Sequence, residues 1–110
     1  MVEDSVALDR VYRALADPTR RALLVALGAG EARISDLAAP LPISFAAVAQ
    51  HVAVLEAAAL IERDVRGREH WLCIRANGLR DAQTWIAHQT SAWDARAAAL
   101  AAHLERSRPT

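Results

Sequence analysis

A short segment that contains two prolines, Pro40 and Pro42, separates two stretches of the chain with helical patterns. Proline cannot continue a helix, because it lacks the backbone N–H and its ring clashes with the preceding turn. Before this break Ser35 is a suitable cap for one short helix, and after it Ser44 is a suitable cap for another. Two short helices joined by a tight turn are typical of a helix-turn-helix, which we expect over residues 35–57.

The second of these helices, over residues 44–55, has two different faces. Its large apolar side chains recur at spacings of three, four and three residues, which predicts an inward face. They are Phe45, Val48, Val52 and Leu55. The side chains left outside are small or polar, namely Ala46, Ala47, Gln50 and Ala53. Small side chains let a helix approach the floor of a groove, so we expect this segment to be a recognition helix.

Two further helices are expected before this motif. Over residues 5–16, apolar side chains recur at i, i+3, i+4 and i+7 and predict one buried face. They are Leu8, Val11, Tyr12 and Leu15. Asp17 and Pro18 then suit the N-cap and the first position of a second helix. We expect Gly28 and Gly30 to end that helix in the left-handed conformation, before a brief extended piece.

Residues 60–75 contain strand-forming side chains on both sides of Gly67. We expect a β-hairpin here, a wing, in which Gly67 supplies the positive φ of the turn. Basic side chains lie at or near its tip, namely Arg63, Arg66, Arg68 and His70. A second interpretation is a simple solvated hairpin, because acidic side chains offset the arginines. Those acids are Glu62, Asp64 and Glu69.

A single long helix is expected over residues 79–106, because its apolar side chains follow one stripe. They are Leu79, Ala82, Ile86, Trp93, Ala97, Leu100 and Leu104. This stripe would be too exposed in a monomer, so we expect the chain to dimerise through it. A dimer core is also the favoured place for Trp85 and Trp93, although the same side chains could line a ligand cavity.

Length and composition favour one domain over the whole chain, residues 1–110, that is mainly α with a small β-hairpin. The hydrophobic fraction is 54%, much of it alanine, and aromatic residues make up only 5%. The formal net charge is zero, so any contact with nucleic acid must depend on where the charges lie. No signal peptide or apolar span is visible, and we expect a cytoplasmic protein without membrane contact.

Motifs for catalysis and for metal binding are not visible in the sequence. Without a carboxylate pair, nucleophile elbow, phosphate loop or zinc protease motif, we expect neither an enzyme nor a cofactor. Cys73 is the only cysteine, which excludes an intrachain disulfide. His88 and His103 have no histidine or cysteine three or four residues away, so an intrachain zinc site is not expected. A ligand or metal site between two subunits is an alternative.

The order of these elements and several short motifs resemble the ArsR family of bacterial transcriptional regulators, over nearly the whole chain. The motifs are ALADPTRR at 14–21, ISFAAV at 43–48 followed by Gln50 and His51, and VLE at 54–56. Gly67 between arginines, followed by a helix that carries Trp85 and Trp93, resembles the subgroup that lacks a metal box.

This resemblance implies a winged helix-turn-helix in the order α-α-(β)-α-α-β-β-α, which represses transcription as a homodimer on a near-palindromic stretch of double-stranded DNA. Residues 1–16 and 79–106 would form the dimer interface through Leu8, Val11, Tyr12, Leu15, Ile86, Trp93, Leu100 and Leu104. On DNA, Ser44 would meet phosphate, and the side chains facing bases would be Ala46, Ala47, Gln50 and His51. The minor groove or the backbone would receive Arg63, Arg66 and Arg68. Gln50 is the expected specific reader, since its amide can pair with adenine through two hydrogen bonds.

Three alanines depart from the pattern of the family. Ala49 and Ala53 stand where serine and lysine are common, which predicts fewer phosphate contacts and weaker binding. Ala59 stands where glycine is common, and we expect a different exit from the recognition helix if that position needs a positive φ. His51 also fits a structural role with a hydrogen bond inside the chain. The alternative function is a winged-helix protein interaction module, and no effector is evident from the sequence.

Overall fold

The computed structural model describes the backbone of residues 2–109, and that range contains five helices and three strands. They are α1 (Val2–Leu15), α2 (Pro18–Leu27), β1 (Ala32–Arg33), α3 (Ile34–Ala38), α4 (Phe45–Ala57), β2 (Ile61–Arg66), β3 (Glu69–Ile74) and α5 (Asn77–Arg106). This order confirms the winged helix-turn-helix, with α3 and α4 as the two helices of the motif and β2 and β3 as the wing. Both α1 and α5 begin a few residues earlier than expected.

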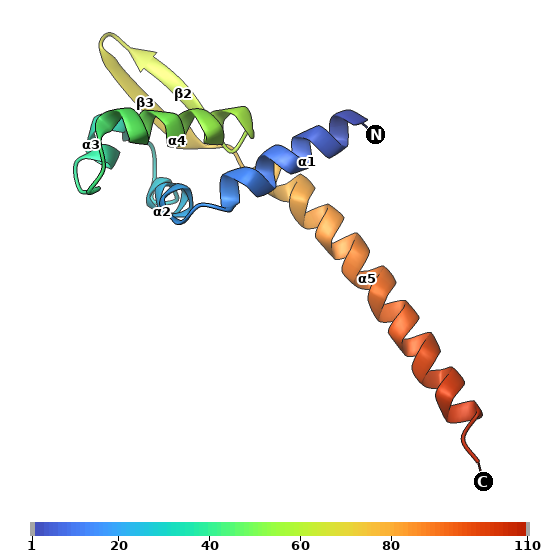
Figure 1. Cartoon of the computed structure of the whole chain (residues 1–110). Helices are drawn as coiled ribbons and strands as arrows, with labels where there is room; N and C mark the ends of the chain where they lie inside the picture. Colours follow the sequence, from blue (N-terminus) through green and yellow to red (C-terminus); the bar gives the residue numbers. More distant parts are fainter. Residues whose placement is uncertain (1, 110) are drawn as a thin grey trace.

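The helices α2, α3 and α4 and the sheet form a head, from which α5 projects as a long rod (Figure 1). The molecule measures 76 × 30 × 22 Å along its principal axes. Helix α1 packs against both α4 and α5 and so connects the head to the rod. The tip of the hairpin and the turn between α3 and α4 lie at the end of the head away from α5 (Figure 1).

The inner face of α4 forms the centre of the hydrophobic core. Val48, Val52 and Leu55 are fully buried on it, and α4 contacts α1, α2, α3 and β2. These positions recur at the helical period, so the opposite face of α4 points away from the core. The expectation that Phe45 belongs to this inward face is wrong, because its side chain is 55% exposed. Phe45 is the first residue of α4 and precedes the part of the helix that the core covers.

The start of α2 has the predicted cap, but its end differs from the prediction. The Asp17 carboxylate accepts a hydrogen bond from the Arg20 N–H at 3.0 Å, and Pro18 occupies the first helical position. Gly28, expected in the left-handed conformation, has a φ of −61° and lies in the right-handed region. Of the two glycines only Gly30 has a positive φ, of +140°. The chain therefore leaves the helical region two residues after Gly28.

The start of α3 lies one residue before the predicted cap. The helix begins at Ile34, and its N-cap is Arg33, which makes no side-chain capping bond. Ser35, the expected cap, is therefore inside the helix. Ile34 is buried in the core, and the packing of this side chain, which local capping rules do not include, sets the boundary.

The three strands form one antiparallel sheet in the order β1-β3-β2. Gly67 turns the hairpin with a φ of +63°, as predicted. The brief extended piece becomes a sheet strand, because β1 pairs with β3 and places Arg33 opposite Trp71. The wing is thereby joined at its base to the segment that leads into α3.

The junction of α1 and α5 is tightly packed. Val11, expected at a dimer interface, is only 3% exposed and belongs to the core of this chain. A Cβ atom on Gly78 would lie 2.9 Å from the Ala58 carbonyl oxygen and 3.3 Å from a Val11 methyl carbon. The start of α5 therefore approaches the end of α4 so closely that only glycine fits at position 78.

The chain leaves α4 through a residue with unfavourable backbone geometry. Ala59 has a φ of +58°, and the Leu60 N–H donates to the Leu55 carbonyl at 3.1 Å. This bond is characteristic of a Schellman C-cap, in which the left-handed position is usually glycine. The expectation of a different exit is therefore wrong, because Ala59 itself adopts the left-handed conformation. The turn directs Leu60 into the core, where it is fully buried.

We expect the substitution Ala59→Gly to stabilise the chain by about 0.5–1 kcal/mol. The left-handed conformation costs a residue with a Cβ roughly 1–2 kcal/mol, and glycine loses about 0.4–1 kcal/mol of that gain through the entropy of the unfolded chain. Urea unfolding at one fixed protein concentration measures the difference. The control Ala53→Gly, in the exposed middle of α4, should be destabilising. A lower urea midpoint for Ala59→Gly would show that Ala59 is not strained.

Candidate nucleic-acid interface

The outer face of α4 is open and nearly free of polar groups. Ala46, Gln50 and Ala53 are exposed, whereas Ala47 is half-buried. The Ser44 hydroxyl oxygen accepts a hydrogen bond from the Ala47 N–H at 3.1 Å and caps the helix, as predicted. Among the predicted base-facing residues, Gln50 therefore supplies the one exposed side-chain amide.

His51, predicted to face bases, is half-buried and lies in a polar cluster beside the start of α2. Its Nδ1 atom is 3.2 Å from the Arg20 guanidinium and 3.8 Å from the Asp17 carboxylate. The same guanidinium donates to the Ala14 and Arg13 carbonyl oxygens at 2.9 and 2.7 Å. Arg20 can donate to Nδ1 only when this nitrogen carries no proton. The cluster holds α4 to the α1–α2 junction, which supports the structural role of His51.

Arg63 lies within the head and does not point from the wing into solvent. Its guanidinium contacts both carboxylate oxygens of Glu56, at 2.7 and 3.2 Å, and lies 2.9 Å from His70 Nδ1. Glu56 belongs to α4 and Arg63 to β2, so this ion pair fixes the wing to α4. The hydrogen bond with Glu56 raises the pKa of Arg63. The resemblance implies a DNA contact for Arg63, but each of its three guanidinium nitrogens already contacts Glu56 or His70.

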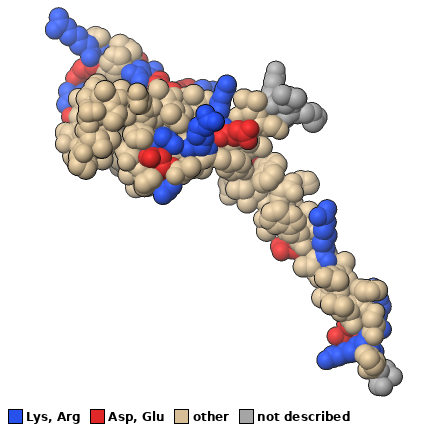
Figure 2. Space-filling view, viewed as in Figure 1, with Lys and Arg blue, Asp and Glu red and all other residues tan. Residues whose placement is uncertain are grey.

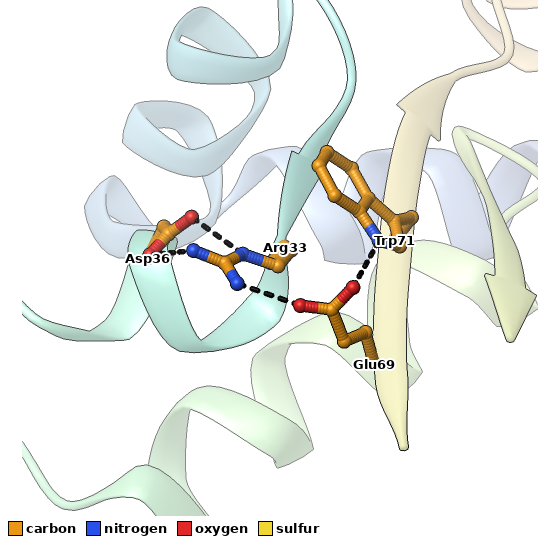
Figure 3. A network of polar contacts seen from close by, with 4 residues as sticks. All are labelled: Arg33, Asp36, Glu69 and Trp71. Atoms are coloured by element: carbon orange, nitrogen blue, oxygen red, sulfur yellow. Dashed lines mark hydrogen bonds and ion pairs between the residues drawn. The ribbon is translucent and has the colours of Figure 1, made fainter. Parts of the chain in front are cut away.

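A second network joins the wing to β1 and α3 (Figure 3). The Arg33 guanidinium donates to Asp36 at 2.9 Å and to Glu69 at 2.6 Å, and the Trp71 indole N–H donates to the other oxygen of Glu69 at 3.4 Å. Arg33 also lies 5.9 Å from the centre of the Trp71 ring. The hydrogen bond from Arg33 lowers the pKa of Glu69. These contacts hold one edge of the hairpin against the helix-turn-helix.

Arg66 extends this network toward the tip of the wing. It lies 4.9 Å from the centre of the Trp71 ring. Its guanidinium donates one hydrogen bond to each carboxylate oxygen of Glu31, at 3.0 and 2.9 Å. It donates a third hydrogen bond to Asp64 at 2.9 Å. These hydrogen bonds raise the pKa of Arg66, and the bond with Glu31 has the largest effect. Exposed ion pairs of this kind contribute only about 0–1 kcal/mol, so a phosphate group can compete with Glu31 for the guanidinium.

Arg68, at the tip, differs from its neighbours in having no salt bridge or side-chain hydrogen bond to any residue in the described part of the chain. Its side chain is exposed and follows the turn residue Gly67. The three predicted wing arginines therefore differ. Arg63 is bound to Glu56 inside the head, Arg66 is exposed but bound to Glu31, and Arg68 is free to bind an external anion.

Comparison with known proteins places this geometry in a family. The model of a helix-turn-helix domain matches residues 15–64, from the end of α1 into β2. HTH-type transcriptional regulator Rv2034 of Mycobacterium tuberculosis is 47% identical over 53 residues, which are 48% of this chain and half of that protein (50%). Transcriptional repressor SdpR of Bacillus subtilis is 28% identical over 79 residues, 72% of this chain and 88% of that protein.

A solved structure extends the match to the wing and to α5. It is an ArsR-like transcriptional regulator from Rhodococcus sp. RHA1, 31% identical, with a TM-score of 0.86 and coverage of 99% of both chains. The chain belongs to the ArsR family of transcriptional regulators. Membership in this family agrees with the winged helix-turn-helix fold, in which α4 is the second helix of the motif.

In this ArsR-family chain the predicted interface residues outside the core lie along α1 and α5. Leu8 and Leu15 are half-buried, and the remaining ones are exposed: Tyr12, Ile86, Trp93, Leu100 and Leu104. Tyr12 meets Trp85 edge to face, with ring centroids 6.3 Å apart. Beside them a cavity of about 660 Å³ opens between α1, the end of α4 and the start of α5, and its lining includes Trp85 and His88. Trp85 therefore contacts α1 of its own chain and lines a cavity, which is one of the two roles predicted for it.

A search of the described residues finds no group of three or more histidine, cysteine, aspartate or glutamate side chains placed to hold a metal ion. Within the same residues, none of the helices has the length and apolar character needed to cross a membrane. Cys73 is half-buried in β3 and is a free thiol.

The sequence alone did not identify the acidic partners of the wing. It suggested that nearby acids offset the arginines, and this holds for Asp64 with Arg66. Arg63 and Arg66 instead find their main partners outside the wing, in Glu56 of α4 and in Glu31 just before β1. The alternation of opposite charges along β2 was a signal that pairing would occur, but not of which residues would pair.

We expect the Asp17 carboxylate to contribute pH-dependent stability. The hydrogen bond from the Arg20 backbone N–H lowers the pKa of Asp17 from its ordinary value of 3.8. Its contribution is therefore complete above pH 3.8 and is lost as the pH falls through the lower folded-state pKa. Urea midpoints of wild type and Asp17→Asn should differ at pH 6 and converge toward pH 3. A difference that stays constant over this range would contradict the assignment.

Proposed function

We propose that this chain is a homodimeric transcriptional repressor that binds double-stranded DNA through α4 and the wing. The observation that carries the proposal is the outer face of α4, which is exposed and lies on a helix whose opposite face is fully buried. A recognition helix needs this combination, because it must be held rigidly by the head while its other side enters the major groove.

On DNA, the alanines of α4 allow a close approach, and Gln50 supplies the donor and acceptor that can pair with the N7 and N6 groups of adenine. The exposed Ser44 lies at the N-terminal end of α4, which carries the positive end of the helix dipole and can approach a phosphate. The proposal assigns no base contact to His51, because its ring is held between Arg20 and Asp17.

The wing would supply the charge that α4 lacks. Arg68 is open at the tip, and Arg66 can exchange Glu31 for a phosphate, so both fit a contact with the DNA backbone. Figure 2 shows that basic and acidic side chains are interspersed on the visible face of the head. Contacts with phosphate must therefore come from particular arginines and not from a broad basic surface.

The α5 helix would provide the dimer interface. Its exposed apolar side chains Ile86, Trp93 and Leu100 are spaced seven residues apart, with Leu104 four residues beyond Leu100. This is the spacing of a coiled-coil seam. From Trp93 to the end of the helix all side chains are exposed, and Figure 2 shows mostly uncharged atoms on the visible side of the rod. A second copy of α5 would cover this stripe.

The shape of the chain supports the same conclusion. Its radius of gyration is 20.2 Å, whereas a compact domain of this length has a value of about 13 Å. A projecting helix without tertiary contacts is only marginally stable in water. The outer half of α5 therefore needs a partner helix.

Two substitutions separate base reading from backbone contact. We expect Gln50→Ala to weaken binding to a site selected from random duplexes by about 1–3 kcal/mol and to relax the preference at one adenine. Arg68→Ala should weaken binding to all duplexes alike. It should also make the slope of the logarithm of the binding constant against the logarithm of the salt concentration less steep by about 1. Fluorescence anisotropy at several salt concentrations measures both effects, with Arg106→Ala at the far end of α5 as the control for Arg68→Ala. Absence of binding to any duplex at low salt would refute the DNA-binding proposal.

The dimer prediction is tested on α5. We expect wild type to sediment as a dimer at micromolar concentration and Leu100→Glu to raise the dimer dissociation constant at least about 100-fold. Burying a leucine contributes about 1.5–3 kcal/mol, and a symmetric dimer contains two of them. The matched control is Ala98→Glu, which adds the same charge outside the stripe and should leave the dimer intact. A monomeric wild type, or equal effects of the two substitutions, would exclude this interface.

A further inference from the structure

Phe45 is a large apolar side chain that this chain leaves uncovered. It is the only phenylalanine in the sequence, the first residue of α4, and 55% exposed. Ile43, just before the cap Ser44, is also exposed, by 39%. Two large apolar side chains therefore flank the cap at the entrance to the recognition helix.

Neither the core nor a polar network accounts for this exposure. The buried positions of α4 begin one turn later, at Val48. A phenyl ring has no polar atom that would favour its contact with water, and burying an exposed side chain of this size is favourable. The position of Phe45 therefore fits a surface that becomes covered when a partner binds.

The position of Phe45 on the helix identifies the covering surface. The N-terminal residues of a recognition helix are those that contact base edges in the major groove. The apolar group that base edges present there is the 5-methyl of thymine, which phenylalanine can contact. The outer face of α4 carries alanines and Gln50, and Phe45 is the one large apolar side chain in the first turn of the helix that is exposed.

We propose that Phe45 is a specificity-determining residue that packs on the 5-methyl group of a thymine in the major groove. This inference rests on the proposed DNA-binding function and adds a second base preference to that of Gln50. Phe45 and Gln50 are five residues apart in α4, so their side chains point in directions about 140° apart around the helix axis and would contact different bases.

The experiment removes the methyl group without changing base pairing. In a duplex selected by wild type from a random pool, each thymine is replaced in turn by deoxyuridine, and binding is measured for wild type, Phe45→Leu and Phe45→Ala. We expect one replacement to weaken wild-type binding about 3- to 5-fold, which is the effect of losing one buried methyl group. Phe45→Ala should bind the two duplexes within 2-fold of each other, and Phe45→Leu should retain part of the difference.

Two controls isolate the contribution of the Phe45 ring. Ile43→Ala removes the neighbouring apolar side chain and should keep the full thymine preference. Phe45→Ala should keep the helical circular dichroism and the sedimentation coefficient of wild type, because the residue lies away from the core and from α5. If Phe45→Ala dissociates the dimer, its ring contacts a second copy and the proposal is wrong.

The outcomes distinguish the inference from the function on which it rests. If wild type binds DNA but every deoxyuridine duplex weakens wild type and Phe45→Ala equally, Phe45 does not read thymine, while the DNA-binding function stands. If wild type binds no duplex at low salt, both proposals are overturned.

Discussion

Burial of Val48, Val52 and Leu55 determines which side of α4 remains outside. Each large side chain that moves from water into the core contributes about 1.5–3 kcal/mol, whereas an exposed ion pair contributes about 0–1 kcal/mol. The rotation of α4 about its own axis is therefore set by these three side chains and not by the charged contacts around it. Because successive residues of a helix are about 100° apart, fixing this face also fixes the outward direction of Gln50.

The polar side chains of α4 that bind other parts of the chain help to fix its position, but they are then not available to contact DNA. His51 is held by Arg20, and Glu56 is held by Arg63, so two polar side chains of α4 connect it to α2 and to the wing. The outer face is left with alanines and one amide. In the proposed complex, most of the contact with phosphate must come from the wing, where Trp71 supports Arg66. Rigidity of the wing base then matters as much as the identity of the residues on α4.

Periodic and local features could be predicted from the sequence, and contacts between distant elements could not. The spacing of the apolar residues gave the buried positions of α4, and the capping rules gave Asp17 and Ser44, because each depends on neighbours within one helical turn. The same spacing misplaced Phe45, since it cannot tell where along a helix the core ends. Ser35 was misplaced because packing of Ile34 outweighs a capping preference. The partners of Arg63 and Arg66 depend on which strands and helices meet, which no local pattern contains.

In the proposed dimer, the uncovered stripe of α5 compensates for the lack of polar groups on the outer face of α4. One head has few groups with which to grip DNA, so its affinity alone would be low. Two heads joined through α5 bind as one unit, and once the first head is on DNA the second acts at a high effective concentration. A symmetric dimer would also place its two recognition helices in major grooves about 34 Å apart, one turn of DNA. In such an assembly specificity arises from two weak readers at a fixed spacing, which is how a helix of alanines can serve as a recognition helix.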